Sequence, residues 1–464
     1  MKRFAALLIA VAVLAAAPVM AADPGHVKIA PNGKGDLLFF PFYYSDQTGI
    51  WTKLTVVNTS ESNSTVAKVV IKTWALSEEV LDFLIYLSPA DVWTGYIATL
   101  DDGNVYLVSY DDSMLTADGK FASLDNLVVQ PLVVPKEPDG NWLGYVYVIN
   151  AASDVDIDGA GVAPDTQKLG RAPGVAKADI KKWYDAFNDA DPDDLVAYDG
   201  DGGFIDEAKP LNILAGWMEL TYGGLYNIAG LNATTLADYQ NQVYIPSGES
   251  TPLDEGDSAN TLADIEAALA KNYVAMPYVN GPFDLAEFTV HMFSFPTKSL
   301  FDGLPSPYFQ KVYDAKTNPL ACIKVDRKIY DLSENSTTRV FSPSPAPDKF
   351  CYEVQPILTF DFPFAEGWAR YTFKATDPEV TVVDNNTIWG DPSRLTYYGS
   401  PVIPTLFDIT LGGVFTSLRY GAWDDGAVAV TAGGEVIYPI TGFNDMVNYH
   451  YSNIPTPNNG VAGE

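Results

Sequence analysis

Residues 51–58 read WTKLTVVN, and the next two segments, TVAKVVIKTW at 65–74 and VLDFLIYL at 80–87, have a similar composition. Each run is short and rich in Val, Ile, Thr, Leu or aromatic residues, and Asn, Ser, Gly, Asp or Pro lie between the runs. β-branched and aromatic residues favour strands, whereas the residues between the runs favour turns. This stretch therefore predicts short β-strands joined by tight turns.

The same pattern continues through 92–100, 105–110 and 142–150. Regularly spaced short strands indicate antiparallel sheets, so the sequence predicts an immunoglobulin-like or jelly-roll-like β-sandwich over residues 23–150. Strand patterns resume further along the chain and predict a second β-rich domain over residues 211–451, followed by a loose tail at 452–464. Those later runs lie at 288–295, 324–330, 352–360, 369–373, 380–383, 407–411, 427–431 and 436–440.

Two other segments differ in composition from these β regions. Residues 1–22 begin with Lys2 and Arg3, continue with an uncharged apolar run and end in small residues, which predicts a signal peptide and export to the periplasm, the cell surface or the exterior. We find no later apolar run long enough to form a transmembrane helix. Residues 151–210 are rich in Asp, Ala, Gly and Lys and include an amphipathic pattern at Ala178–Phe187, so we expect a helical, acidic insertion.

The charge of the chain limits its partners. It has 59 Asp and Glu but only 28 Lys and Arg, which gives a formal net charge of −31. We see no basic cluster along the sequence that interrupts this trend, so binding to nucleic acid or to anionic lipid is disfavoured. The partners that the composition favours are a second copy of the chain, in an assembly, or a cell-surface glycan.

The acidic insertion contains one metal-binding pattern. Asp154, Asp156 and Asp158 alternate, Gly159 follows, and Asp165 comes after five further residues. This spacing matches a calcium loop except that the last ligand is Asp, which reaches the ion less easily than Glu. The sequence predicts a Ca²⁺ site formed by these four carboxylates, and a solvated acidic turn is the alternative.

The chain has two cysteines, Cys322 and Cys351. Because an exported protein meets an oxidising environment, we expect these two residues to form a disulfide. Two buried thiols are the alternative.

Catalytic signatures are scarce. The chain has three His, namely His26, His291 and His450, and we find none of the common hydrolase, nucleotide-binding or zinc-protease motifs. His291 lies inside an apolar run and is predicted to be a satisfied sheet residue rather than a ligand. A pair of carboxylates could still serve a glycosidase, since that reaction needs only two acids at a suitable separation. The sequence favours a protein that is not an enzyme.

Aromatic residues are abundant, with 9 Trp, 27 Tyr and 23 Phe, and they are densest at 39–44. Aromatic rings serve both as sheet cores and as exposed platforms for sugars. For the dense cluster we expect core packing.

Several phrases resemble a family of uncharacterised secreted proteins of proteobacteria. These phrases are LTVVNT at 54–59, EVLDF at 79–83, YLSPADVWTG at 86–95, FSFPTK at 293–298 and FSPSP at 341–345. The resemblance implies a location outside the cytoplasm and association with the cell surface, and it assigns no functional residue.

Together these features favour a secreted, non-enzymatic structural or adhesive protein of the cell surface. One version of this role is a subunit of a self-assembling layer or filament that Ca²⁺ stabilises. A carbohydrate-binding or glycan-processing protein is the first alternative, and an outer-membrane-associated β protein is the second. A row of exposed aromatic residues would favour glycan binding, whereas unpaired strand edges or large apolar patches would favour assembly.

Overall fold

The computed structural model describes most of the chain between residues 27 and 440, with gaps. The described residues are 27–61, 64–133, 141–153, 177–178, 180–181, 197–198, 204–205, 212–239, 265–266, 268–271, 273–280, 287–301, 322–338, 349–373, 400–410, 414–420, 427–430 and 436–440. Within them, no helix has the length and apolar character needed to cross a membrane. The predicted signal peptide at 1–22 and the tail at 452–464 lie outside these residues.

The described strands build mainly antiparallel β sheets, as the sequence predicts. Sheet 1 has six strands in the spatial order β1-β14-β2-β9-β4-β5. Their bounds are β1 Lys28–Ile29, β14 Thr234–Ala237, β2 Leu37–Tyr44, β9 Leu143–Ser153, β4 Thr65–Thr73 and β5 Glu79–Leu87. Sheet 2 also has six strands, in the order β13-β12-β3-β6-β7-β8. Their bounds are β13 Tyr226–Asn232, β12 Leu214–Tyr222, β3 Ile50–Asn58, β6 Val92–Thr99, β7 Val105–Ser109 and β8 Val128–Pro131.

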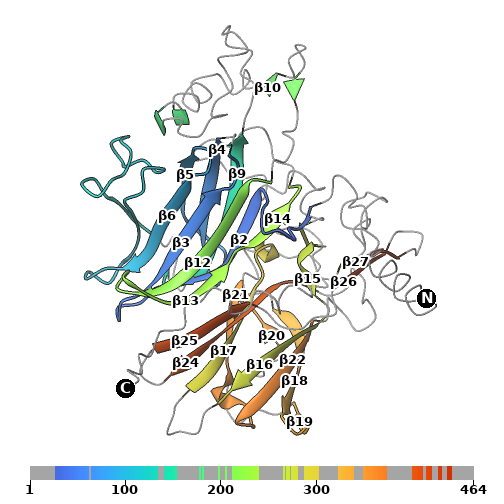
Figure 1. Cartoon of the computed structure of the whole chain (residues 1–464). Helices are drawn as coiled ribbons and strands as arrows, with labels where there is room; N and C mark the ends of the chain where they lie inside the picture. The colour runs from blue at the N-terminus through green and yellow to red at the C-terminus, as the bar shows by residue number, and fades with distance from the viewer. Residues whose placement is uncertain are drawn as a thin grey trace, which may run out of the picture.

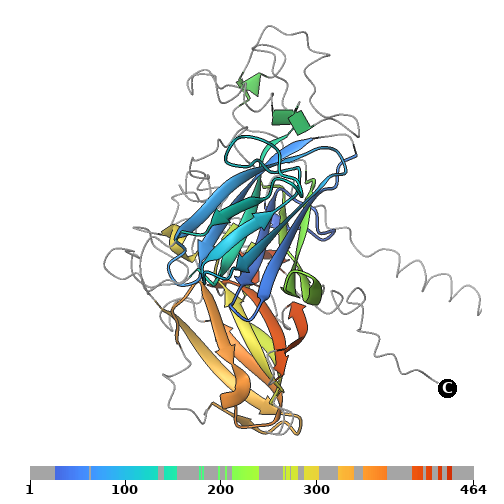
Figure 2. The same ribbon diagram turned by 90° about the vertical axis from the view of Figure 1, so that its left-hand side faces the viewer.

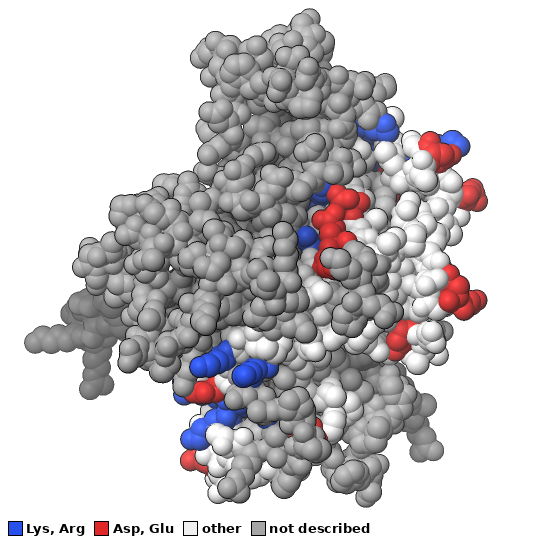
Figure 3. All heavy atoms as spheres, turned by 180° about the vertical axis from the view of Figure 1, so that it is seen from behind, with Lys and Arg blue, Asp and Glu red and all other residues white. Residues whose placement is uncertain are grey.

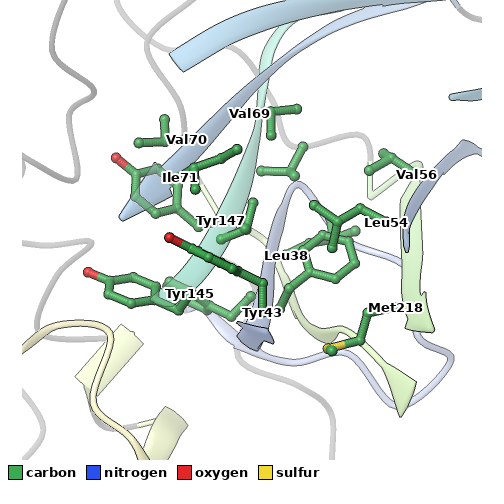
Figure 4. Packing of buried hydrophobic residues seen from close by; sticks show 14 of the residues in the cluster. Leu38, Tyr43, Leu54, Val56, Val69, Val70, Ile71, Tyr145, Tyr147 and Met218 are labelled. Carbon is green, nitrogen blue, oxygen red and sulfur yellow. The ribbon is translucent and has the colours of Figure 1, made fainter. Parts of the chain in front are cut away.

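Sheets 1 and 2 form the first sandwich, because their inner faces bury one apolar core. Leu38 of sheet 1 and Leu54 and Met218 of sheet 2 are fully buried in this cluster (Figure 4). Strand alternation places these residues on the inner faces, since successive side chains of a strand point to opposite sides. The dense aromatic cluster at 39–44 is also buried, since Phe39, Phe40, Phe42 and Tyr43 have no exposed surface.

The first sandwich includes strands from beyond the boundary that we expected at residue 211. β12 pairs along its whole length with β3, from Leu214 opposite Asn58 to Tyr222 opposite Ile50. β14 pairs with β2. Residues 214–237 therefore complete both sheets of the first sandwich, and the insertion interrupts this domain instead of separating two domains.

The second sandwich follows in the sequence and also has two sheets. Sheet 3 has the order β16-β22-β18-β19, with β20 also pairing with β18, and sheet 4 has the order β21-β17-β24-β25. Their bounds are β16 Tyr273–Val279, β22 Glu366–Phe373, β18 Ile323–Asp331, β19 Ser336–Thr337 and β20 Lys349–Phe350 in sheet 3, and β21 Val354–Leu358, β17 Glu287–Ser294, β24 Ile403–Thr410 and β25 Val414–Tyr420 in sheet 4. Aromatic rings fill the core between them, among them Phe293, Phe350 and Tyr371.

Shorter elements connect or flank the two sandwiches. Two of these elements are short 3₁₀ helices, η3 Lys298–Phe301 and η4 Thr359–Asp361. Three two-stranded sheets pair β10 with β11, β15 with β23 and β26 with β27. Their strands are β10 Ala197–Tyr198, β11 Phe204–Ile205, β15 Ala270–Lys271, β23 Ser400–Pro401, β26 Ala427–Val430 and β27 Val436–Ile440. Residues 177–178 and 180–181 are helical, at the start of the helix predicted for the insertion.

The two sandwiches lie one above the other and share a packed joint (Figures 1 and 2). Phe42 of β2 stacks on Phe407 of β24, with ring centroids 5.7 Å apart. Val354 of β21 donates its backbone N–H to the carbonyl of Trp74 at 2.9 Å. The side of sheet 4 that faces away from sheet 3 therefore contacts the first sandwich at Phe407 and Val354.

The predicted disulfide between Cys322 and Cys351 is confirmed. Cys322 directly precedes β18, and Cys351 directly follows β20, whose Phe350 pairs with Ile323. The bond thus closes the end of the β18–β20 ladder, three residues before Val354, which bonds to Trp74 of the first sandwich.

Candidate functional site

Two of the four large sheets are covered on both faces. On the outer face of sheet 1, Phe39, Tyr147 and Val70 are almost completely buried, and they belong to one buried cluster with Tyr239, Ile265 and Leu269. Sheet 4 faces sheet 3 on one side, and on the other side its Val290, Met292 and Phe407 belong to the same buried cluster as the first sandwich. The outer faces of sheets 2 and 3 remain.

The outer face of sheet 2 bears a set of partly exposed aromatic residues. Alternation along each strand sends Leu54 and Trp93 into the core and their neighbours to the surface. We call this surface the aromatic face. Its residues are Trp51, Lys53, Thr55 and Val57 of β3, Val92, Thr94 and Tyr96 of β6, Tyr106 and Val108 of β7, Tyr110, Val129 of β8, and Trp217 and Glu219 of β12.

An ion pair lies at the centre of the aromatic face. Lys53 Nζ lies 2.8 Å from Glu219 Oε2, and both side chains are mostly buried, with 25% and 18% of their surface exposed. The strand register places Lys53 between Glu219 on one side and Tyr96 on the other. The rings therefore surround charged groups that can donate and accept hydrogen bonds.

Two tryptophans lie on either side of this pair. Trp217 pairs with Thr55, four residues from Trp51 along β3, so the two tryptophan positions are about 13 Å apart along the strand direction. Trp217 is 36% exposed, whereas Trp51 is half-buried. The rings are spaced along the face instead of forming one stack, which suits an extended ligand.

The turn between β12 and β13 limits access to Trp51. Gly224 has a φ of +70°, and a Cβ atom at this position would lie 2.9 Å from the Trp51 ring. Glycine is required here both by its left-handed backbone and by this close approach. The turn therefore holds the Trp51 ring at the end of the face.

The hydroxyls of Tyr96 and Tyr106 on this face stay protonated at neutral pH. Burial and a hydrogen bond with Tyr110 raise the pKa of Tyr96 to about 12, and the nearby carboxylate of Glu219 adds to the effect. The hydroxyl of Tyr106 donates to Asp102 Oδ2 at 2.6 Å and its pKa is raised by this bond. These phenols are neutral groups that combine an apolar ring with a polar tip.

The predicted calcium ligands Asp154, Asp156, Asp158 and Asp165 lie outside the described residues. The Ca²⁺ site therefore stays a prediction from the sequence. Among the residues that the structure describes, no group of three or more His, Cys, Asp and Glu side chains could hold a metal ion.

His291 lies in the core of the second sandwich and is fully buried. Its Nε2 lies 2.8 Å from the carbonyl of Pro277, and its Nδ1 lies 2.7 Å from the hydroxyl of Tyr371. Because a carbonyl can only accept, Nε2 donates a hydrogen bond to Pro277, and Nδ1 accepts one from the Tyr371 hydroxyl. Burial lowers the pKa of His291 to about 4. The ring is neutral and satisfied, as expected for a sheet residue.

The segment at 88–91, which lies within the phrase YLSPADVWTG, has a structural role. Asp91 Oδ2 accepts hydrogen bonds from the backbone N–H and the hydroxyl of Ser88, at 2.9 and 3.0 Å, which closes the turn between β5 and β6. Lys177, within the insertion, forms an ion pair with the same carboxylate and bonds to Ser113 Oγ at 2.6 Å. This turn therefore also anchors the insertion to the first sandwich.

The central residues of the aromatic face were not singled out from the sequence. Trp217 and Glu219 occur as WME in a segment that we assigned to another domain, and Lys53 and Tyr96 lie in separate strands. The available signal was alternation: each of these residues alternates with a buried neighbour such as Met218. Only the pairing of β12 with β3 places them on the same face.

Comparison of the chain with protein-family models, with curated proteins and with solved structures finds no match. The resemblance to secreted proteins of proteobacteria therefore stays an expectation from the sequence.

Proposed function

We propose that the protein is a secreted, non-enzymatic adhesive protein that binds neutral glycans through the aromatic face. The observation that carries this proposal is the placement of exposed Trp217 and Tyr110 and of half-buried Trp51 on the same face as the ion pair of Lys53 and Glu219. Aromatic rings stack on the apolar faces of pyranose rings, and charged side chains bond to the sugar hydroxyls. A surface with both features fits a sugar polymer.

The charge of the face favours a neutral ligand. Lys53 and Glu219 form a pair, so they add no net charge at the centre. Asp102 and Asp111 lie at the rim, and the whole chain has a net charge of −31. A polyanion would meet repulsion at this face, whereas a neutral polysaccharide would not.

The strand edges favour adhesion over assembly by strand addition. The edge strands β8, β16 and β21 contain Pro131, Pro277 and Pro356. Proline lacks the N–H that pairing with another chain requires. These three edges are therefore poor templates for the strands of a second copy.

The long edge strand β5 is covered by the chain itself. Its Tyr86 N–H donates to the Ser113 carbonyl at 2.8 Å, and its Val80 carbonyl accepts from Val133 at 3.3 Å. Lys177 Nζ also bonds to the Tyr86 carbonyl at 3.2 Å. This edge leaves few backbone groups for a partner strand, so the self-assembling layer or filament that the sequence also favoured gains no support from these four edges.

Binding to insoluble and soluble neutral polysaccharides tests the proposal. The mature chain with its disulfide intact is incubated with cellulose, chitin, xylan and mannan, and bound protein is measured. We expect at least one of these polymers to bind and Trp217→Ala to weaken that binding about tenfold, or about 1.4 kcal/mol. Phe360→Ala is the matched control, because Phe360 is 56% exposed but lies on the second sandwich. Absence of binding to every neutral polymer, or equal binding by both variants, would refute the proposal.

A further inference from the structure

The outer face of sheet 3 gathers positive charge in a chain that is otherwise acidic. β18 alternates buried Ile323, Val325, Arg327 and Ile329 with exposed Lys324, Asp326 and Lys328. The register places Arg370 of β22 and Lys349 of β20 on the same side as these lysines. We call this surface the basic face. Figure 3 shows Lys and Arg atoms gathered on the lower part of the molecule, where the second sandwich lies.

Two pairs of cations lie directly opposite each other across this sheet. Lys328 pairs with Arg370, and Lys324 pairs with Lys349. Like charges at directly opposite positions destabilise a sheet. Within the described residues, none of the four side chains forms an ion pair. An anion placed between two such cations would relieve their repulsion.

Aromatic rings lie among these cations. Tyr330 and Trp368 stack with their centroids 4.0 Å apart and their planes 5° apart. Lys328 Nζ lies 5.0 Å from the Tyr330 centroid, and the Arg370 guanidinium lies 4.0 Å from the Tyr273 centroid. The Nε atom of Arg370 is buried and has no hydrogen-bond partner. The basic face therefore combines charge with ring platforms that are already in place.

Acidic side chains do not cancel this charge. Asp326 and Glu366 lie on the same side of sheet 3, against four cations. The excess is positive although the chain as a whole has a net charge of −31. The expectation that no basic cluster exists holds for the linear sequence, but the fold forms one from three separate strands.

We infer that the basic face binds an acidic polysaccharide, with carboxylates between the cations and sugar rings on Tyr330 and Trp368. The cations at Lys324 and Lys349 extend the same site toward the disulfide. A uronic acid polymer supplies both of the required features, because each unit has a carboxylate and a ring with apolar C–H groups. An Asp-rich segment of a second copy would match the cations but offer nothing to the stacked rings. A nucleic acid has a denser charge and would be repelled more strongly by the rest of the chain.

This inference goes beyond the proposed function, because it concerns another sheet and another class of glycan. The two can fail separately. Trp217→Ala should affect neutral polymers alone, whereas changes on the basic face should affect acidic polymers alone.

The test uses the mature chain on immobilised polygalacturonate at several salt concentrations. We expect binding that weakens as salt increases, since exposed charge pairs are screened. The double variant Lys324→Gln with Lys328→Gln should bind about tenfold more weakly and depend less on salt. The matched control, Lys34→Gln with Lys120→Gln, removes two exposed cations from the first sandwich and should bind as the unmodified chain does.

Trp368→Phe provides a second readout that keeps every charge. It should weaken binding while leaving the salt dependence unchanged, because it alters the stacked platform only.

The inference is wrong if the chain does not bind polygalacturonate at low salt, or if both double variants bind equally. Tighter binding of single-stranded DNA through the same lysines would assign the face to nucleic acid instead. Loss of a dimer in light scattering for the Lys324 and Lys328 variant would assign it to a second copy.

Discussion

Lys324 of β18 lies directly opposite Lys349 of β20, and both side chains are exposed on the same side of sheet 3. Repulsion between them costs stability, because directly opposed like charges are unfavourable by a few tenths to about 1 kcal/mol. Lys349→Glu would replace this repulsion by an attractive pair. We therefore expect the variant to unfold at a higher urea concentration, with a gain of up to about 1 kcal/mol that shrinks in high salt.

Lys34→Glu is the control for this prediction, since it makes the same charge change at an exposed loop of the first sandwich. It should give no gain. If Lys349→Glu is also neutral or destabilising at low salt, the opposed lysines do not repel measurably and one argument for the basic face is lost.

The disulfide should contribute substantially to the stability of the second sandwich. It closes a loop with a sequence separation of 29 residues, for which the chain-entropy relation gives about 3 to 4 kcal/mol. We expect Cys322→Ala with Cys351→Ala to lower the free energy of unfolding by about this amount. Urea unfolding of the oxidised chain, the reduced chain and the variant would show it. The reduced chain and the variant should agree, and an unchanged midpoint in both would contradict the prediction.

The strands themselves could be predicted well from the sequence, but their partners could not. The runs at 51–58, 65–74 and 80–87 match β3, β4 and β5 closely, because composition and alternation are local properties. The pairing of Trp217 with Thr55 joins residues more than 150 positions apart. Local patterns do not contain that information, so residues 214–237 were assigned to the wrong side of a domain boundary.

The same limit explains what was missed at the binding faces. The chain was expected to have no basic cluster because Lys324, Lys349 and Arg370 are separated by more than 20 residues each along the sequence. Their register in sheet 3 places them on one face. By contrast, the disulfide needed no register, since Cys322 and Cys351 are the two cysteines of the chain and therefore have each other as intramolecular partners.

The buried ion pair between Lys298 and Glu353 should show strong coupling. Both side chains are fully buried, with Nζ 3.5 Å from Oε1, and Lys298 also donates to the Cys351 carbonyl at 2.8 Å. Lys298→Met would leave the Glu353 charge buried beside an apolar group, which costs about 3 to 5 kcal/mol. Adding Glu353→Gln should recover part of this loss, because it removes the isolated charge.

A double-mutant cycle on urea unfolding measures the coupling. We expect the double variant to be more stable than the sum of the two single effects by at least about 1 kcal/mol. Simple additivity would show that the two groups do not interact in the folded chain.

His291 should make stability depend on pH in the mildly acidic range. Its pKa is lowered from 6.5 to about 4 by burial, so the folded chain holds it neutral while the unfolded chain binds a proton at higher pH. The unfolded state therefore binds more protons between pH 6.5 and 4, and this contribution to stability decreases as the pH falls through that window. The loss is about 3 kcal/mol at its full extent.

His291→Gln keeps a donor for Pro277 but cannot titrate, so its stability should fall less over this range. Urea unfolding of both proteins at pH 7, 5.5 and 4.5 measures the difference, with the other titrating groups common to both. Imidazole resonances of His291 that titrate near pH 6.5 in the folded chain would contradict the prediction, whereas titration below pH 5 would support it.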